Sequence, residues 1–247
     1  MKFLGASWEA PPSVKAFSTT RTGGTSEPPY ASLNLGIHVG DQVDRVLANR
    51  ALVRDALGWA AEPFWLDQVH GTRVVRVDAS GADPRGADGA VTEVPGQPLV
   101  VLTADCLPVV ACDRGATVVG AFHAGWRGLL AGILREGVAA LGRPAPDLLF
   151  WIGPAIGPRS YQVGPEVREA YLAADPAYAG DFSPDGVGHW KFDLPGAALR
   201  QVRALGVGSV VQSRWDTFAD PNFFSFRREG PCGRLGTFIA LEKRGIS

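Results

Sequence analysis

The chain has 247 residues, of which 46% are hydrophobic, and it carries a formal net charge of −1 at pH 7. This length and apolar content can form a substantial core, and because no linker divides the chain we expect one domain over residues 1–247. The arginines are scattered and form no basic tract, so we expect no nucleic-acid partner. These properties leave the oligomeric state open.

The amino-terminal residues and the cysteines bear on cellular location. The first residues lack the apolar core of a signal peptide, and no apolar run is long enough to cross a membrane. Cys106, Cys112 and Cys232 have no paired spacing and suit a reducing compartment. We therefore expect a cytoplasmic protein without a membrane partner.

In the first half of the chain, apolar periodicity predicts one helix and several short strands. The helix has Asp41 as its N-cap and ends near Leu57. Strands are expected at residues 14–18, 64–66, 72–77, 99–103, 109–112 and 117–122. The last three follow one another too closely for helical crossovers, so this part of the sheet should be antiparallel.

In the second half, helical and extended patterns alternate. Helices are expected at residues 129–141, 167–173 and 196–205, and strands at residues 148–152, 209–212, 223–226 and 236–241. Because hairpin-like and crossover connections occur together, we expect a layered α/β or α+β domain with mixed sheets.

The segment His123–Gly128 places an imidazole, a cation and two glycines where a predicted strand meets a helix. Cys106 and His70 also follow predicted strands, and one thiol with two imidazoles suits zinc with a fourth position open. The spacing of the three residues matches no compact zinc finger. Two alternatives therefore stay open: a buried thiol with two hydrogen-bonded histidines, and a hydrolase in which Cys106 is the nucleophile.

Several residues could bind an anion or a nucleoside. Arg127 lies at a predicted helix start, where backbone N–H groups favour phosphate, although it could equally be a surface arginine. Arg21, with neighbouring hydroxyl and amide donors, makes a second possible anion cradle or a plain polar turn. Asn34 and His38 could contact a base or a ribose, although Asn in a loop most often stabilises a turn.

Taken together, these motifs resemble the YfiH-type family, whose members have been labelled laccase-domain or polyphenol oxidase proteins and are described as purine nucleoside-processing enzymes. The resemblance covers nearly the whole chain. It includes Ser18–Gly24, Ser32–Asp41, Asn49-Arg50, Gln68–Gly71, Ala87–Gly89, Thr103–Val109, His123–Gly128, Gly153–Pro158 and Phe223–Arg228. The chain departs from the family in two places. Relatives often have a Cys-Thr pair where this chain has Gln212–Trp215, and a Thr where it has Cys232.

The resemblance implies an α+β fold, a single-domain layered αββα arrangement with mixed sheets, and zinc bound by His70, Cys106 and His123. It implies phosphorolysis of adenosine, inosine and guanosine to the base and ribose 1-phosphate, and of methylthioadenosine to methylthioribose 1-phosphate. It also implies deamination of adenosine. Purine nucleosides and phosphate are then the partners.

Within that framework each candidate residue has an expected role. Cys106 and His123 belong to the catalytic group, and Asp105 is the candidate proton carrier. Arg21, Asn34 and Arg127 are the candidates for binding substrate and phosphate.

Two other activities come with the resemblance. A multicopper laccase needs several coppers with imidazole ligands, which four histidines cannot supply, so copper is expected only as a substitute for zinc. A bacterial relative is described as a peptidoglycan editing factor, which keeps a Cys/His hydrolase as an alternative.

Overall fold

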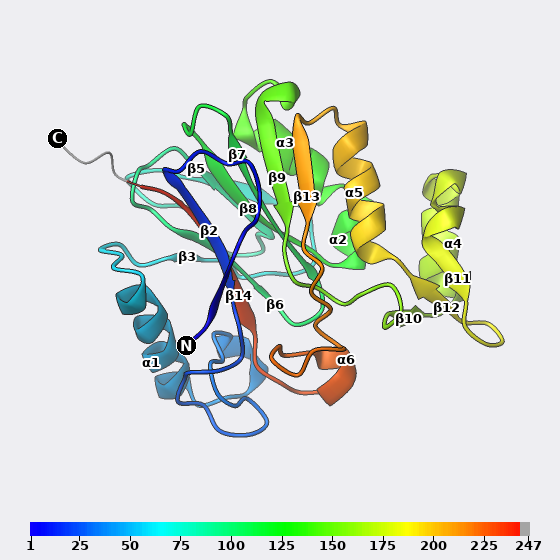
Figure 1. Ribbon diagram of the computed structural model, residues 1–247, viewed down its shortest axis with the longest axis horizontal. Helices are drawn as coiled ribbons and strands as arrows, with labels where there is room; N and C mark the ends of the chain where they lie inside the picture. Colours follow the sequence, from blue (N-terminus) through cyan, green and yellow to red (C-terminus); the bar gives the residue numbers. More distant parts are fainter. Residues whose placement is uncertain (243–247) are drawn as a thin grey trace.

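The computed structural model describes residues 1–242 and contains two sheets packed face to face, with helices on both outer faces (Figure 1). The five-stranded sheet has the order β1 (Phe3–Gly5), β2 (Val14–Thr19), β14 (Leu235–Leu241), β6 (Leu99–Thr103) and β3 (Phe64–Trp65). The six-stranded sheet has the order β13 (Ser209–Gln212), β9 (Leu148–Ile152), β7 (Leu107–Asp113), β8 (Val119–Ala124), β5 (Gly89–Thr92) and β4 (Val74–Val77).

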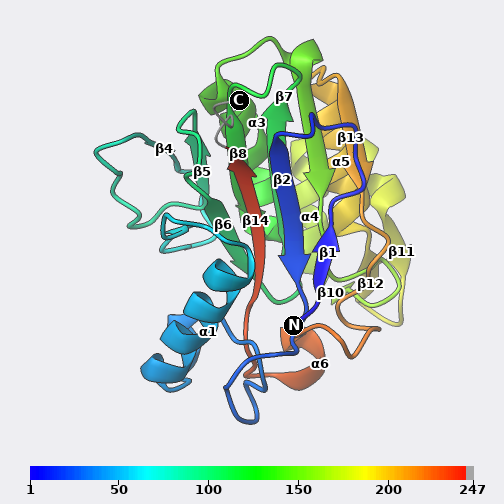
Figure 2. The same ribbon diagram turned by 60° about the vertical axis from the view of Figure 1, so that its left-hand side comes forward.

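Helices cover the outer face of each sheet. The five-stranded sheet is covered by α1 (Val43–Ala56), and the six-stranded sheet is covered by α2 (Trp126–Ala131), α3 (Ile133–Leu141) and α5 (Leu194–Ala204). In Figure 2, β2 and β14 lie in front of β7 and β8, and α5 lies behind them. The predicted αββα arrangement is therefore confirmed.

Both sheets are mixed. The hairpin β7–β8 is antiparallel, as the short connections predicted, but the expectation that residues 99–103 belong to the same sheet was wrong, because β6 lies in the five-stranded sheet. Three pairs are parallel: β3 with β6, β4 with β5, and β13 with β9. Every residue of β6, β7 and β8 is buried, because each strand has a facing sheet on one side and helices on the other. This burial explains why these strands appear in the sequence as continuous apolar runs.

The remaining elements lie beside the two main sheets. They are α4 (Pro165–Ala174), α6 (Phe226–Glu229), a small sheet of β10 (Gln162–Val163), β12 (Trp190–Phe192) and β11 (Phe182–Pro184), and the 3-10 turns η1 (Ile37–Val39), η2 (Ala145–Asp147) and η3 (Pro176–Asp181). None of the helices in residues 1–242 has the length and apolar character to cross a membrane.

Three local expectations were wrong. The N-cap of α1 is Gln42, because the Asp41 side chain accepts from the adjacent amide of Gln42 and leaves the helix uncapped by a side chain. The helix expected over residues 129–141 is interrupted at Gly132, whose φ of 101° separates α2 from α3. Residues 223–226 form no strand, because the Ser225 hydroxyl caps α6.

Candidate metal centre

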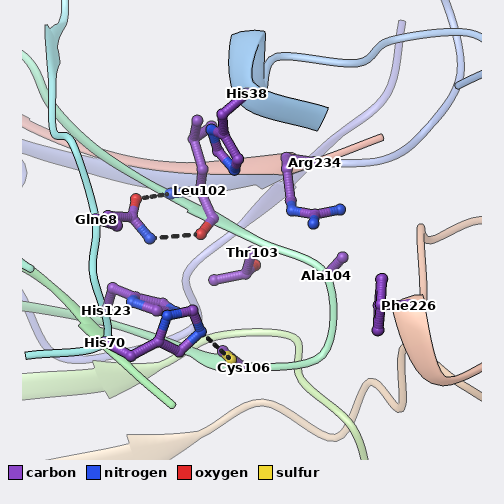
Figure 3. A pocket seen from close by; sticks show the side chains of 10 residues that line it. All are labelled: His38, Gln68, His70, Leu102, Thr103, Ala104, Cys106, His123, Phe226 and Arg234. Carbon is purple, nitrogen blue, oxygen red and sulfur yellow. Dashed lines mark hydrogen bonds between the residues drawn. The ribbon is translucent and has the colours of Figure 1, made fainter. Parts of the chain in front are cut away.

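His70, Cys106 and His123 lie together and form what we call the His-Cys-His cluster (Figure 3). One ligand atom from each residue falls within 4.8 Å of the other two, and Cys106 Sγ is 3.8 Å from His70 Nε2. His70 belongs to the connection from β3 to β4, Cys106 to the turn from β6 to β7, and His123 to β8. The cluster therefore lies where the chain passes from one sheet to the other.

The buried carboxylate of Asp88 orients two residues of this cluster. It accepts hydrogen bonds from the backbone amides of Val69, His70 and Gly71 at 3.1, 2.9 and 2.7 Å, and Asp88 Oδ1 lies 2.8 Å from His123 Nδ1. A carboxylate that receives the Nδ1 hydrogen leaves Nε2 of His123 free to bind a metal. The sequence analysis missed this role, although Asp88 is a charged residue directly before the buried strand β5.

Left-handed backbone shapes both connections that carry the cluster. His70 has a φ of 63° and Asp105, just before Cys106, has a φ of 95°. Non-glycine residues adopt these angles rarely and at a cost, and they concentrate at functional sites. The two connections are therefore strained at a ligand of the cluster, His70, and directly before another, Cys106.

Two glycines of the His123–Gly128 segment are required because neighbouring residues lie too close to them for a side chain. A Cβ on Gly125 would lie 2.8 Å from His70 Cδ2 and 3.1 Å from Cys106 Sγ, and one on Gly128 would lie 2.8 Å from the carbonyl oxygen of Gly71. The glycines thus make room for the cluster, a reason that the sequence alone did not provide.

The Cys106 thiol and the His123 imidazole stabilise each other's charged forms. Burial raises the pKa of the Cys106 thiol, but the neighbouring His123 and His70 outweigh burial and lower it to about 6. Burial lowers the pKa of His123, but Cys106 and Asp88 raise it to about 9. The thiolate and the imidazolium therefore favour each other, and a cation in place of the proton would likewise favour the thiolate.

The donor set fits a zinc ion. Two imidazoles and a thiolate are zinc ligands, their atoms are close enough to converge on one ion, and a carboxylate fixes one imidazole. Copper accepts the same donors, so this set alone does not separate the two metals.

A cavity of about 340 Å³ opens beside the cluster. It is lined by His38, Gln68, His70, Leu102, Thr103, Ala104, Cys106, His123, Phe226 and Arg234 (Figure 3). The Gln68 side chain fixes one wall, because its amide donates to the Leu102 carbonyl at 2.9 Å and its oxygen accepts from the Leu102 amide at 2.7 Å.

Four of the candidate residues are not part of the cavity lining found within residues 1–242. Asp105 uses both carboxylate oxygens to hold neighbouring loops, accepting from the Thr217 hydroxyl and the Arg227 amide at 2.7 Å each. Arg127 is exposed and stacks over the Trp126 ring at 4.3 Å.

The other two candidates stabilise loops. The Arg21 guanidinium donates to both carboxylate oxygens of Glu229, at 2.8 and 3.0 Å. Asn34 is buried, and its side chain bonds to backbone groups of Gly36 and Arg234 and to the Asp41 carboxylate. Arg21 and Asn34 therefore support the loops around the site from behind the cavity wall.

The structure adds cavity residues that sequence reasoning passed over. Thr103 and Phe226 lie in motifs quoted for the family, and Arg234 follows two residues after the departure at Cys232, but nothing in the sequence indicated that the three face one space. His38, considered earlier for a base or ribose, does line the cavity.

Fold and site together define a single-domain α+β protein with mixed sheets and a His/Cys cluster that can hold a metal. Residues 15–242 match the family described as multi-copper polyphenol oxidoreductase laccase, and the chain belongs to this family.

Named relatives and solved structures agree with this assignment. The chain is 41% identical to purine nucleoside phosphorylase YfiH of Escherichia coli over 241 residues, which are 97% of this chain and 99% of that protein. It is 43% identical to a purine nucleoside phosphorylase of Pseudomonas aeruginosa over 242 residues, 97% and 98% of the two chains.

The solved structures share the whole fold. A Neisseria meningitidis protein of family DUF152 has a TM-score of 0.94 and 39% identity, covering 98% of this chain and 100% of that one. A Bacillus licheniformis hypothetical protein YfiH has a TM-score of 0.88 and 32% identity, covering 93% of each chain.

Proposed function

We propose that the protein is a zinc-dependent purine nucleoside phosphorylase. The observation that carries the proposal is the cavity of about 340 Å³ with the His-Cys-His cluster on its wall, in a chain whose relatives are named purine nucleoside phosphorylase. The proposed substrates are inosine, adenosine, guanosine and methylthioadenosine. The proposed products are the free base and ribose 1-phosphate, or methylthioribose 1-phosphate from methylthioadenosine.

In this reaction a phosphate oxygen forms a bond to ribose C1′ as the bond from C1′ to the purine nitrogen breaks. The bonding electrons leave with the base, which then takes up a proton. His70, Cys106 and His123 would hold the zinc, and when bound it supplies positive charge that polarises a substrate atom. The protein's task is to bring phosphate and nucleoside together and to stabilise the charge that develops.

The cavity residues outside the cluster suit a nucleoside. Phe226 is 54% exposed and offers an aromatic face on which a purine can stack. Partial burial, together with the positive charges of Arg234 and Arg50, lowers the pKa of His38. His38 is therefore neutral at pH 7 and can hydrogen-bond to a ribose hydroxyl or a purine nitrogen.

Deamination of adenosine is the less well supported part of the family's activities for this chain. It needs a group that carries a proton to the departing ammonia, a task that zinc deaminases give to a carboxylate. Within the described residues the cavity lining has no carboxylate, and Asp105 is engaged elsewhere. Release of ammonia is therefore measured separately from release of base.

The proposal is tested by incubating the purified, zinc-loaded protein with inosine, with and without phosphate. Hypoxanthine and ribose 1-phosphate should appear only with phosphate. Hypoxanthine with free ribose in the absence of phosphate would indicate a hydrolase instead. No product in either reaction, with zinc bound, contradicts the proposal.

Thiol catalysis is the second candidate, because the Cys106 thiol has a pKa of about 6 and lies 3.8 Å from His70 Nε2. This geometry also suits a nucleophile and its base in a hydrolase, including one that edits peptidoglycan precursors. Cys106→Ala distinguishes the roles: a metal ligand loses zinc and turnover together, whereas a nucleophile loses turnover with zinc retained.

A multicopper oxidase is disfavoured by the number of imidazoles. Only two of the four histidines lie in the cluster, and His189 bonds to the Val187 carbonyl of its own loop. Copper bound here would be a single ion in place of zinc.

A further inference from the structure

We infer that Arg234 is the residue that binds the phosphate substrate, an inference that rests on the proposed phosphorylase function. It goes beyond the sequence candidates, because Arg21 and Arg127 do not belong to the cavity lining found in the described chain. The ligand is inorganic phosphate, and the site is the end of the cavity formed by Arg234, His38 and Thr103.

Arg234 faces the same cavity as the His-Cys-His cluster and is held in place from behind. Its Nη1 donates to the carbonyls of Cys232 and Gly233 at 2.9 and 3.1 Å. In the part of the chain that the structure describes, its guanidinium forms no salt bridge. A fixed guanidinium with free donors and no carboxylate partner is suited to a phosphate oxyanion.

A second arginine, Arg50, adds positive charge near the Arg234 end of the cavity. Arg50 donates to the Leu35 carbonyl at 3.0 and 2.8 Å and lies 3.7 Å over the Trp65 ring, again without a salt bridge among residues 1–242. Both arginines lower the pKa of His38, and the exposed Asp67 opposes them only in part. Neither arginine is held in a salt bridge among residues 1–242, and the carboxylates of Glu62 and Asp67 offset their charge only from a distance.

Thr103 adds a neutral polar group between Arg234 and the cluster (Figure 3). Its residue is 2% exposed, and its hydroxyl is the buried side-chain group left without a hydrogen-bond partner in the described structure. A buried hydroxyl without a partner is costly, and because Thr103 lines the cavity, a rotation of its side chain would let the hydroxyl donate to a phosphate oxygen.

The competing arginines lack these properties. The charge of Arg21 is neutralised by Glu229 at 2.8 Å, and Arg127 projects over Trp126 on the exposed start of a six-residue helix. Only Arg234 combines a guanidinium free of salt bridges with a place in the cavity lining within residues 1–242.

The test compares Arg234→Gln and Arg234→Lys with wild type, and Arg135→Gln is the matched control because Arg135 is an exposed arginine on α3. In steady-state assays at saturating inosine, Arg234→Gln should raise the KM for phosphate about tenfold to a hundredfold, as expected for a lost charged hydrogen bond. The KM for inosine should change less than twofold, Arg234→Lys should recover part of the loss, and Arg135→Gln should match wild type.

Calorimetry with inorganic phosphate tests the inference without turnover. Wild type should bind phosphate, Arg234→Gln should bind it at least about tenfold more weakly, and both should contain the same zinc. Thr103→Val should also weaken phosphate binding, by a smaller factor. If wild type releases no base from inosine, the proposed function fails while this measurement still decides the role of Arg234.

Three outcomes would overturn the inference. The first is phosphate binding by Arg234→Gln within twofold of wild type. The second is a large loss in Arg127→Gln instead. The third is binding of inosine 5′-monophosphate, but not of inorganic phosphate, that depends on Arg234, because the arginine would then recognise a nucleotide.

Discussion

Asp88 is the residue on which the geometry of the cluster depends most. Four hydrogen bonds converge on its carboxylate, three from backbone amides and one from His123. Asp88→Asn puts amide hydrogens where an N–H already points, so His70 and His123 should lose their orientation. Zinc affinity should fall about tenfold to a hundredfold, as measured by competition with a chelator.

The control is Asp83→Asn, because Asp83 is an exposed carboxylate on the neighbouring turn, where it pairs with Arg85. This control should bind zinc as wild type does. Equal zinc affinity in Asp88→Asn and wild type would show that the cluster holds its geometry without the carboxylate.

Thr103 offers a second test at the scale of one residue. Because its buried hydroxyl lacks a partner, Thr103→Val should stabilise the free protein by about 1 kcal/mol, measured by urea unfolding. Thr237→Val is the matched control, since that buried hydroxyl lies 2.6 Å from the Ser18 hydroxyl on the next strand. The control should destabilise by about 1 kcal/mol. Destabilisation in both variants would mean that Thr103 already has a partner.

Among the elements, the β7–β8 hairpin depends on the carboxylate of Asp113. It accepts from the amides of Thr117 and Val118 at 2.6 and 2.9 Å and from the Thr117 hydroxyl at 2.8 Å. Burial raises the pKa of Asp113, but these bonds outweigh it and lower the pKa below its usual value. Its stabilising effect is therefore present above about pH 4, the pKa range of an unfolded Asp, and is lost as pH falls through the folded-state pKa.

Asp113→Asn should consequently reduce the free energy of unfolding by about 1–2 kcal/mol at pH 7, and the reduction should become smaller when the pH is lowered to 3. Urea unfolding at the two pH values measures the difference. Asp147→Asn, an exposed carboxylate beside the same turn, should show little change at either pH. A deficit in Asp113→Asn that is equal at both pH values would rule out the ionised carboxylate as its source.

The elements also show what the sequence could predict. Strands such as β6 and β9 were found because their apolar runs are short and bounded by polar turns, and His70, Cys106 and His123 were found because they end such runs in family motifs. The break at Gly132 depends on a left-handed backbone angle, which periodicity does not report.

The rest of the site depends on contacts between distant segments. Asp88 joins the loop at His70 to β8, and Arg234 reaches the cavity from the start of β14. No local pattern in either segment marks these contacts, because Asp88 meets His123 only when β5 pairs with β8, and Arg234 meets the cavity only when the two sheets pack. Phe226 was misread because an aromatic run resembles a strand, whereas the Ser225 cap makes it the first residue of α6.

At the scale of the whole molecule, the cluster links the two sheets. The connections that carry His70 and Cys106 each run from the five-stranded to the six-stranded sheet, and His123 lies within the latter. An ion held by all three residues therefore crosslinks segments that the unfolded chain separates. A ligand that binds the folded state but not the unfolded state stabilises the fold by mass action.

Removal of zinc should accordingly lower the stability of the whole domain and leave its fold intact. With zinc at a thousandfold excess over its dissociation constant, stabilisation is about 4 kcal/mol, which corresponds to a Tm difference of about 10 °C for a chain of this size. Thermal unfolding of the zinc-loaded and chelator-treated protein measures the difference. Cys106→Ser is the control, because its Tm should be lower from the start and should respond little to the chelator. An ion held by all three segments must be released when the sheets separate, so its removal must lower the Tm. If chelation removes the zinc yet leaves the Tm of wild type unchanged, the ion does not hold the three segments together.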